Sequence, residues 1–294
     1  MRKLPEIKSS GQALPIIVLI MAVALTIGLA VTSRTITDIE ISEQTREAAR
    51  AFSAAEAGIE EALVGIGETT FKDDLEAGVS YTATKTEIGA GVSYVFPQTS
   101  GPDEVRTLWL AEHDTLNGFY DYDELEILWG NVGTDPAIEI SLYYQDGSDF
   151  KVTKFLFDPN EIRDPENYFC HPNGDNCENV KCGGADNTFC TSEVEMGEAR
   201  FQYQVILKLA DAGVVGAGKT PLFARIRFLY TSEAQKLGVR ASGNGVENFP
   251  SQGVQVTSVG ETEMSTRKVE VVRLHPAPPG IFDFLLYSEI NLSK

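Results

Sequence analysis

An apolar segment near the N-terminus constrains this chain more than any other feature of its sequence. Residues 13–31 contain no charged side chain. At about 1.5 Å per residue in a helix, they come close to spanning the ~30 Å hydrocarbon core of a bilayer. Arg2, Lys3 and Lys8 precede the segment, and a basic flank of this kind is typically retained on the cytoplasmic side. The segment predicts a single membrane span with the N-terminus inside and the rest of the chain outside.

The sequence after this segment continues as a helix instead of turning into a loop. Residues 32–66 contain no proline and are rich in Ala and Glu, which are good helix formers. We expect one helix over residues 12–66, in lipid over about residues 13–31 and amphipathic from residue 32 onward. Apolar residues recur there at helical spacing and predict a stripe that packs against protein. This stripe comprises Phe52, Ala55, Ile59, Ala62 and Ile66.

Shorter features refine the helix. Glu47 and Arg50 lie three residues apart and are expected to pair on its outer face. Gly65 and Gly67 are expected to end it. A secretory signal peptide cut near Ala30 is the alternative reading, but such a peptide has no need for an apolar stripe beyond the membrane. The two-part helix therefore favours an anchor that also packs against protein.

Two stretches carry a resemblance to type IV prepilins. KSSGQAL at residues 8–14, followed by the apolar segment, resembles a prepilin leader and the start of the mature chain. AFSAAEAGIEEAL at residues 51–63 is similar to the matching stretch of PilX-type minor pilins. The resemblance covers about residues 1–66. It implies a leader at residues 1–11, a cut between Gly11 and Gln12 by a prepilin peptidase, and partners that are other pilin-like subunits. The positions implied for anchoring and helix packing are Ile16, Phe52, Ala55, Glu56, Gly58, Ile59 and Leu63.

The chain departs from the family at the start of the implied mature sequence. Gln12 stands where members usually have a hydrophobic residue, and Pro15 follows shortly after. Ile16 stands where major pilins carry a glutamate that is thought to meet the N-terminal amine of the preceding subunit. A buried carboxylate needs such a partner, so a subunit without one forgoes that pairing. K-type minor pseudopilins are similar in this respect, which implies a tip or initiation position. The alternative is an anchor that never enters a fibre.

The remainder of the chain is acidic. The formal net charge is −19 over 294 residues, and residues 1–66, with six basic and eight acidic side chains, account for only −2 of it. An excess this acidic argues against neutralising phosphates, so no nucleic-acid partner is expected. It suits a soluble domain displayed outside the membrane.

From about residue 67 the helical period gives way to short β-branched and aromatic runs separated by turn signals. The predicted fold class is therefore α+β, a long N-terminal helix followed by a mostly antiparallel β-sandwich-like domain, either one large sandwich or two smaller ones. The predicted strands are Val79–Thr84, Val92–Phe96, Val105–Leu110, Glu124–Trp129, Ile138–Tyr144, Lys151–Phe157, Arg200–Leu209, Phe223–Tyr230, Gln235–Ala241, Gln252–Val259, Arg267–Leu274 and Phe282–Tyr287. The aromatic residues expected in the core are Trp109, Trp129, Tyr143, Phe155, Tyr203, Phe228 and Tyr230.

All the cysteines lie in a loop-like insertion at about residues 158–192. Cys170, Cys177, Cys182 and Cys190 form an even, clustered set, which favours two local disulfides in an oxidising compartment. Three pairings are open. A zinc site that includes His171 and a set of free thiols are the alternatives.

Two other motifs suggest ligands. Residues 213–220, GVVGAGKT, match the phosphate-binding pattern G-x-x-x-x-G-K-[ST]. The residues that follow alternate like a strand, where a nucleotide site needs a helix, so we interpret the motif as a glycine-rich hairpin loop and expect no nucleotide. An acidic run supplies the weak calcium candidates Asp121, Asp123, Glu124 and Glu126, although it lacks EF-hand spacing.

No catalytic signature accompanies these motifs. His113, His171 and His275 are isolated in the sequence, and no nucleophile or metalloprotease motif surrounds them. We therefore expect no enzyme, no cofactor and no metal. The predicted function is a structural subunit of a type IV pilus-like fibre or its assembly machinery. The alternative is a membrane-tethered binding module or adhesin that does not polymerise, with the cysteine loop and acidic run as its surface.

Overall fold

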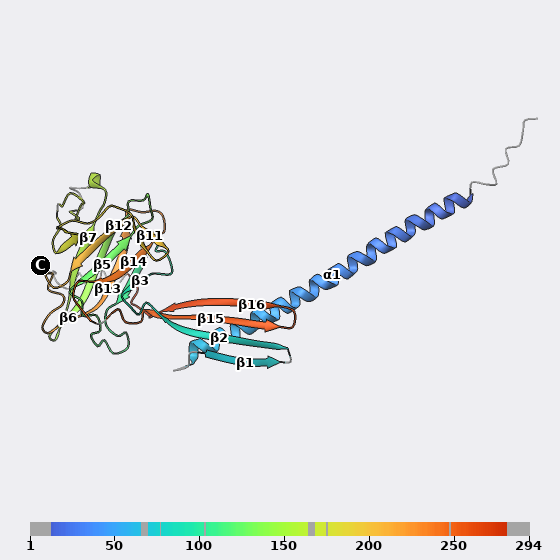
Figure 1. The fold of residues 1–294 in the computed structure, drawn as a ribbon, viewed down its shortest axis with the longest axis horizontal. Coiled ribbons are helices and arrows are strands. Elements are labelled where there is room, and N and C mark those ends of the chain that lie inside the picture. Colours follow the sequence, from blue (N-terminus) through green and yellow to red (C-terminus); the bar gives the residue numbers. More distant parts are fainter. Residues whose placement is uncertain are drawn as a thin grey trace, which may run out of the picture. The chain divides into compact units, whose positions relative to one another are not determined.

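The computed structural model describes residues 13–65, 70–76, 78–102, 104–163, 168–174, 176–246 and 248–280. It confirms the α+β class, because one long helix, α1 (Ala13–Val64), precedes a mostly antiparallel β-rich region (Figure 1). The chain forms two compact units. Unit 1 contains α1 and strands close to it in Figure 1, and unit 2 contains residues 86–255 and the chain from residue 272.

Unit 1 combines α1 with one antiparallel sheet. Its strands are β1 (Thr70–Glu76), β2 (Val79–Ile88), β15 (Gly253–Thr262) and β16 (Thr266–Leu274). They pair in the order β1-β2-β15-β16, so a hairpin from late in the chain completes a sheet that an early hairpin begins. The strands lie along the last part of α1 (Figure 1). Phe71, Tyr81 and Val256 form a small buried cluster with Ala54 and Ile59 of the helix.

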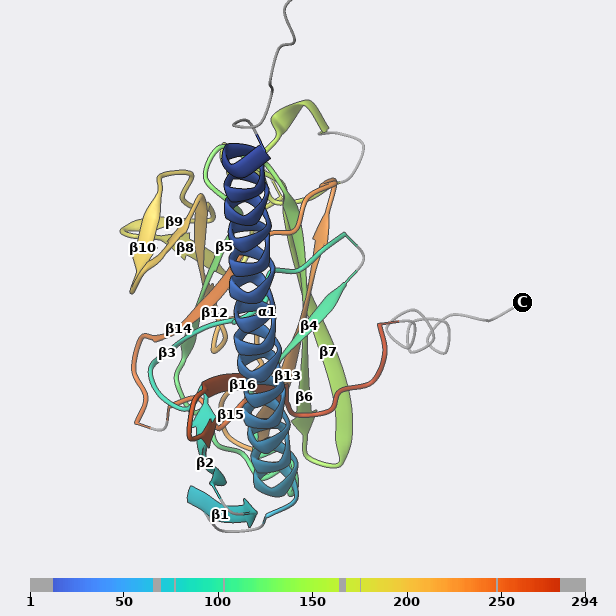
Figure 2. The ribbon, with the colours of Figure 1, turned by 90° about the vertical axis from the view of Figure 1, so that its right-hand side faces the viewer.

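Unit 2 is a sandwich of two sheets, visible as separate layers in Figure 2. The first sheet has the order β3-β14-β5-β12-β8-β9, and the second has the order β4-β13-β6-β7. A separate hairpin pairs β10 with β11. The bounds of these elements are β3 (Ser93–Val95), β4 (Val105–Trp109), β5 (Glu124–Trp129), β6 (Ala137–Asp146), β7 (Asp149–Phe157), the 3-10 helix η1 (Glu161–Arg163), β8 (Val180–Cys182), β9 (Ala185–Asp186), β10 (Val194–Met196), β11 (Ala199–Phe201), β12 (Tyr203–Lys208), β13 (Lys219–Leu229) and β14 (Leu237–Ser242).

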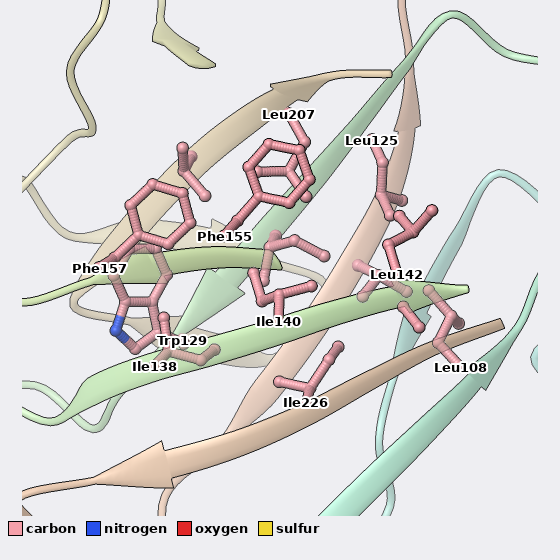
Figure 3. Close-up of a cluster of buried hydrophobic side chains, with 14 of the residues drawn as sticks. Leu108, Leu125, Trp129, Ile138, Ile140, Leu142, Phe155, Phe157, Leu207 and Ile226 are labelled. Carbon is pink, nitrogen blue, oxygen red and sulfur yellow. The ribbon is translucent and has the colours of Figure 1, made fainter. Parts of the chain in front are cut away.

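The core of unit 2 lies between its two sheets (Figure 3). Alternate residues of each strand point inward, as the two-residue period of a strand requires. Trp129 of β5 is fully buried, packs against Phe157 and donates its indole N–H to the Pro136 carbonyl at 3.1 Å. The large buried side chains labelled in Figure 3 are Leu108, Leu125, Trp129, Ile138, Ile140, Leu142, Phe155, Phe157, Leu207 and Ile226.

The predicted strands between residues 79 and 274 all correspond to observed strands, with one important difference. The run predicted as a single strand, Arg200–Leu209, breaks at Gln202 into β11 and β12. Phe201 packs against Leu128 on the outer side of β5, whereas Tyr203 joins the core, so the chain changes layers between them. The strand predicted at residues 282–287 lies outside the described residues.

The aromatic prediction was wrong for Tyr230. Its side chain is 56% exposed. The prediction was also wrong for Tyr143, which is only partly buried and lies outside the core cluster. Trp129, Phe155, Tyr203 and Phe228 belong to the core cluster as predicted, and Trp109 is buried outside that cluster. Tyr230 follows the end of β13 with a φ of 55°. In that left-handed conformation the chain leaves the strand, so the side chain no longer shares the inward face.

Candidate functional site

The first half of α1 has the properties of a membrane span. From Leu14 to Ser42 every side chain is exposed, and the helix contains a strongly apolar window with none of its residues buried. Threonine hydroxyl groups bond within the helix: Thr26 donates to the Val23 carbonyl at 2.8 Å and Thr32 to the Gly28 carbonyl at 2.9 Å. This arrangement leaves no polar group of these side chains unpaired in lipid. The helix is a candidate single membrane span.

The residues implied for leader processing and anchoring lie at positions 11–16 of the sequence. Gly11 and Gln12 lie outside the described residues. Ile16 is 55% exposed in the first turns of α1, so its side chain is presented to the surroundings. Pro15 lies in the first turn, where a missing backbone N–H costs no helix bond.

The second half of α1 buries a stripe of small residues against the sheet of unit 1. Ala51, Ala55 and Ala62 are each fully buried, and Ile59 is 7% exposed. The prediction for Ala55, Ile59 and Ala62 is therefore confirmed. Phe52 is half-exposed, and its placement in the stripe was wrong. Ile66 lies outside the described residues.

Close approach of helix and sheet explains why small residues occupy this stripe. A Cβ atom at Gly260 of β15 would overlap the backbone of Ala51 and Ala55. A Cβ atom at Gly58 would overlap the Ser258 hydroxyl and the Tyr81 ring. Glycine at both positions lets the backbones approach, and a ring such as Phe52 finds no room on this face.

Other implied packing positions have different roles in this arrangement. Leu63 is partly buried and packs against the apolar cluster of unit 1. Glu56 is exposed on the helix surface. The similarity stretch at residues 51–63 thus contributes both the buried stripe and a polar face left for water or another protein.

Ion pairs connect α1 to the sheet of unit 1. Glu47 and Arg50 pair at 2.7 Å as predicted, but Glu47 is 6% exposed, so the outer-face placement was wrong. Arg50 also reaches Glu76 of β1 at 2.7 Å. The hydrogen bond from Arg50 lowers the pKa of Glu47 and outweighs its partial burial.

Polar contacts also secure the C-terminal turns of the helix. Lys85 Nζ donates to the Gly65 carbonyl at 2.9 Å, which places a cation where a helix C-terminus favours one. The Tyr81 hydroxyl donates to Glu61, and burial together with this carboxylate raises the pKa of Tyr81 to about 12. Tyr81 therefore stays neutral and keeps its donor role throughout the physiological range.

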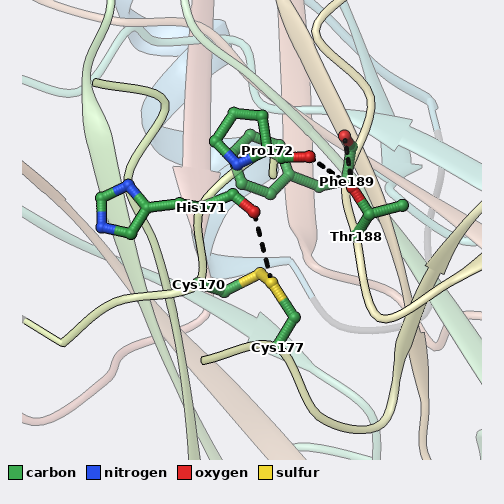
Figure 4. The surroundings of a disulfide bond; sticks show 6 residues. All are labelled: Cys170, His171, Pro172, Cys177, Thr188 and Phe189. Atoms are coloured by element: carbon green, nitrogen blue, oxygen red, sulfur yellow. Dashed lines mark hydrogen bonds between the residues drawn. A yellow bond between two sulfur atoms is a disulfide. The ribbon is translucent and has the colours of Figure 1, made fainter. Parts of the chain in front are cut away.

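The four cysteines form two local disulfides, which confirms the disulfide prediction. Cys170 pairs with Cys177 and Cys182 with Cys190, so neighbours in the sequence are joined and the zinc and free-thiol alternatives are wrong. The first bridge is buried beside His171, whose carbonyl lies 3.4 Å from the Cys177 sulfur (Figure 4). The bridges restrain a loop that contributes Phe189 to the sandwich core.

Replacing Cys170 and Cys177 together with serine should lower the free energy of unfolding of unit 2 by about 2–3 kcal/mol. The bridge closes a short loop, and the chain-entropy model gives this magnitude for the freedom regained by the unfolded chain. Urea unfolding of the oxidised protein and the double variant measures the difference. Equal midpoints for the two proteins would contradict the expectation.

The calcium candidates all have partners within the protein. Asp123 accepts the Asn244 backbone N–H at 2.6 Å, and Asp121 accepts that of Val246 at 2.8 Å. Glu124 pairs with Lys181, and Glu126 accepts from Gln204. Burial raises the pKa of Glu126 despite the nearby Arg240. Among the described residues no three His, Cys, Asp or Glu side chains form a group suited to a metal.

The glycine-rich motif at residues 213–220 joins two sheets. It leads directly into strand β13, where a phosphate-binding loop would lead into a helix. The hairpin interpretation was wrong, because β12 and β13 belong to different sheets and the loop is a crossover between them. Lys219 turns back to donate to the Gly213 carbonyl at 2.7 Å, and Gly213 has a φ of 70°.

The sequence gave no sign that two distant histidines meet. His113 and His275 stack with ring centroids 4.7 Å apart and planes 8° from parallel. They line a cleft of about 410 Å³ in unit 2 that also includes Glu87, Glu112 and Phe249. These two histidines are isolated in the sequence, and only the folded chain brings His275, the residue after β16, beside His113 in the segment after β4.

Acidification should weaken unit 2 through this pair. Burial and the neighbouring His113 lower the pKa of His275, with Arg273 acting in the same direction and Asp114 and Glu87 opposing it. On acidification His275 therefore takes up its proton at a higher pH in the unfolded chain than in the folded chain. The free energy of unfolding keeps its full value above about pH 6.5 and falls as the pH drops below that value. Urea unfolding at pH 7 and pH 5 should show the loss, and His275→Gln should reduce it. An unchanged pH dependence in that variant would contradict the assignment.

No protein-family model matches the chain, and neither the curated proteins nor the solved structures contain a significant match. Function is therefore inferred from the geometry of α1 and from the chemistry of the residues around it.

Proposed function

We propose that this chain is a pilin-like subunit of a surface fibre or of its assembly machinery. The observation that carries the proposal is that the two halves of α1 differ in polarity and in what they contact. The helix is unbroken over 52 residues, bare and apolar in its first half, and docked on a four-stranded sheet in its second. Such a helix can reside in lipid before assembly and pack among other helices after it.

The exposed surface of the helix supports association with similar helices. Phe52 is 46% exposed beyond the apolar segment, and Ile41, about three helical turns earlier, is 56% exposed. Water disfavours apolar side chains presented in this way. Contact with other subunits would remove them from water, while the buried stripe keeps the sheet attached.

The orientation proposed for the chain places the β-rich region outside the cytoplasm. Basic residues precede the apolar segment and would remain on the cytoplasmic side. The two disulfides are typical of an oxidising compartment. Ile16, which cannot form the carboxylate pairing of a major pilin, fits a subunit at the tip or at initiation of a fibre.

Processing at the N-terminus tests the proposal. Mass spectrometry of the mature protein should find Gln12 at its N-terminus, and Gly11→Ile should leave the leader attached. Ser10→Ala is the matched control and should still be processed. An intact leader in the native protein, or a cut near Ala30, would sink the proposal.

The second candidate is a membrane-tethered binding module that does not polymerise. The cleft lined by His113, His275 and Glu112 is the observation in its favour, because it offers a concave surface formed by residues of unit 2. Mechanical shearing of cells, which detaches surface fibres, distinguishes the two candidate functions. A fibre subunit should be recovered in the sheared fraction with other subunits, and a tethered module should remain with the membranes.

A further inference from the structure

The sheet of unit 1 has two long edges. In its order β1-β2-β15-β16, the outer strands β1 and β16 have seven and nine residues, and within the described chain each pairs with a strand on one side only. Proteins usually shorten or cover such edges, because their unpaired backbone groups attract another strand. Unit 1 therefore presents backbone hydrogen-bonding groups along both sides of its sheet.

The edges of unit 2 are shorter or partly covered. Its first sheet ends in β3 and β9, with three and two residues, and β4 of the second sheet has five. The long edge strand β7 is covered at its end, because Cys170 donates its backbone N–H to the Leu156 carbonyl at 2.8 Å and accepts that of Asp158 at 3.0 Å. The open edges of unit 1 are thus a distinct feature of this chain.

The two open edges carry opposite charge. Acidic side chains outnumber basic ones by three to one on β1, and the ratio is reversed on β16. The charged residues, all exposed, are Lys72, Asp73, Asp74 and Glu76 on β1 and Arg267, Lys268, Glu270 and Arg273 on β16. Glu76 pairs with Arg50 at 2.7 Å, and Lys268 pairs with Glu270 at 3.4 Å. Without these pairs an acidic excess remains on β1 and two arginines remain on β16, so each edge attracts the other.

The edge strands also run in opposite directions. β1 and β2 are antiparallel. Gln252, just before β15, donates its N–H to the Ile88 carbonyl at the end of β2 at 2.7 Å, and its carbonyl accepts the His275 N–H just after β16 at 2.9 Å. Neighbouring strands therefore alternate in direction across the sheet. A second copy placed beside the first without rotation presents its β16 antiparallel to β1.

Anchoring in one membrane disfavours contacts between identical edges. The strands lie along α1 (Figure 1). Antiparallel pairing of two copies of β1, or of two copies of β16, needs a two-fold axis perpendicular to the strands, which would point the two helices in opposite directions. Parallel pairing of identical strands keeps both helices in one bilayer but places like charges side by side. Pairing of β1 with β16 avoids both conflicts.

We propose that β1 of one copy pairs with β16 of a second copy, so that the sheet of unit 1 continues from one anchored chain to the next. The contact rests on the proposed membrane anchor but does not require entry into a fibre. Backbone hydrogen bonds supply the affinity of such strand addition, and side chains select its register. Each copy carries both edges, so it can bind a neighbour on either side.

One register satisfies the side chains of both edges. When Lys72 lies opposite Glu270, Asp74 lies opposite Lys268, and no like charges are directly opposed. A shift by two residues opposes Lys72 with Lys268 in one direction and Asp74 with Glu270 in the other. A shift by one residue would place Phe71, on the helix side of the sheet, opposite a residue of the outer side. The opposed positions are Thr70–Val272, Phe71–Val271, Lys72–Glu270, Asp73–Val269, Asp74–Lys268 and Leu75–Arg267.

Cysteine crosslinking between two differently marked copies tests the pairing in membranes. Lys72→Cys in one copy and Glu270→Cys in the other should form a mixed dimer under mild oxidation, because directly opposed residues lie within disulfide reach. Within one copy these positions are three strand spacings apart, roughly 14 Å, and cannot join. The native cysteines are all paired. Thr266→Cys, exposed on the same face of β16, is the matched control for Glu270→Cys and should give about tenfold less dimer.

Each variant expressed alone distinguishes the contact from its alternatives. Lys72→Cys alone or Glu270→Cys alone should give little dimer, and a yield equal to that of the mixture overturns the proposal. Absence of the mixed dimer from membranes that contain both variants overturns it as well. Because both chains are then known to be anchored, that result counts against the contact and not against the proposed anchor or the fibre.

Charge exchange tests the register. Adding Asp74→Lys to the Lys72→Cys copy should lower the yield of mixed dimer about fivefold, because it opposes two lysines. Adding Lys268→Asp to the Glu270→Cys copy should restore the yield. A yield that does not fall, or that falls and is not restored, contradicts the register.

Hydrogen exchange tests the pairing without any substitution. In phosphatidylcholine vesicles, backbone amides of β1 and β16 in the full chain should exchange more slowly at high copy density than after dilution with lipid. Amides of the central strands β2 and β15 should not change. Exchange at both edges that is independent of copy density overturns the proposal.

Discussion

Replacing Ile20 and Ala24 together with aspartate should release the protein from the membrane almost completely. Residues 14–31 include eleven Leu, Ile and Val side chains, each more than half exposed. On the biological insertion scale these contribute about −3 to −7 kcal/mol in total, and two aspartates near the centre cost about 5–7 kcal/mol. The cost is therefore about as large as the whole gain, and insertion loses its driving force. Fractionation of cells into membrane and soluble pools measures the result.

The position of the charges matters in this test. Ile36→Asp with Ile39→Asp adds the same two charges to the same helix beyond the apolar window, and the protein should remain in the membrane pool. Contacts with the sheet begin at Glu47, so neither pair should alter the free energy of unfolding of unit 1. A soluble Ile36/Ile39 variant, or an Ile20/Ala24 variant that stays in the membrane, would contradict the assignment of the span.

The sequence was sufficient for the elements whose signals are local. The candidate membrane span follows from a charge-free run, and strands such as β5 follow from a short apolar run between turns. Strand β1 was missed because TFKDDLE is mostly charged and only Phe71 is buried. Strand β1 is held in place by pairing with β2. The composition of β1 alone does not reveal this pairing.

Contacts between distant segments could not be read from the sequence. The helix was expected to bury Phe52 because it falls at helical spacing with Ala55 and Ile59. The observed stripe is instead set by Gly260, more than 200 residues away, which brings the sheet too close for a ring. Likewise the stacking of His113 on His275 depends on where the strand order places the end of β16, which the local sequence does not reveal.

Gly260→Ala should lower the free energy of unfolding of unit 1 by roughly 1–3 kcal/mol, the range found for overpacked cores. In an ordinary strand the same change stabilises by about 0.4–1 kcal/mol, because alanine restricts the unfolded chain. Gly260 has a φ that L-residues adopt, so its backbone would accept alanine. The opposite sign is expected here because the added methyl meets the helix backbone.

Hydrogen exchange in detergent measures this effect locally. Amides of β1, β2 and the last turns of α1 should exchange faster in Gly260→Ala, while those of β5 and β6 in unit 2 should not change. Val259→Ile adds one methylene on the opposite face of β15 and should leave both sets unchanged. Faster exchange in the control would indicate that β15 tolerates no added volume on either face.

Second-site changes distinguish a backbone contact from a side-chain contact. Gly58→Ala should destabilise unit 1 as well, but its methyl meets the Ser258 hydroxyl and the Tyr81 ring. Ser258→Gly should therefore recover part of the loss in Gly58→Ala, since it removes an atom in the way. Ala51→Gly should recover nothing in Gly260→Ala, because the carbonyl in the way remains. Rescue by Ala51→Gly would show that side chains, and not the backbones, set the distance between helix and sheet.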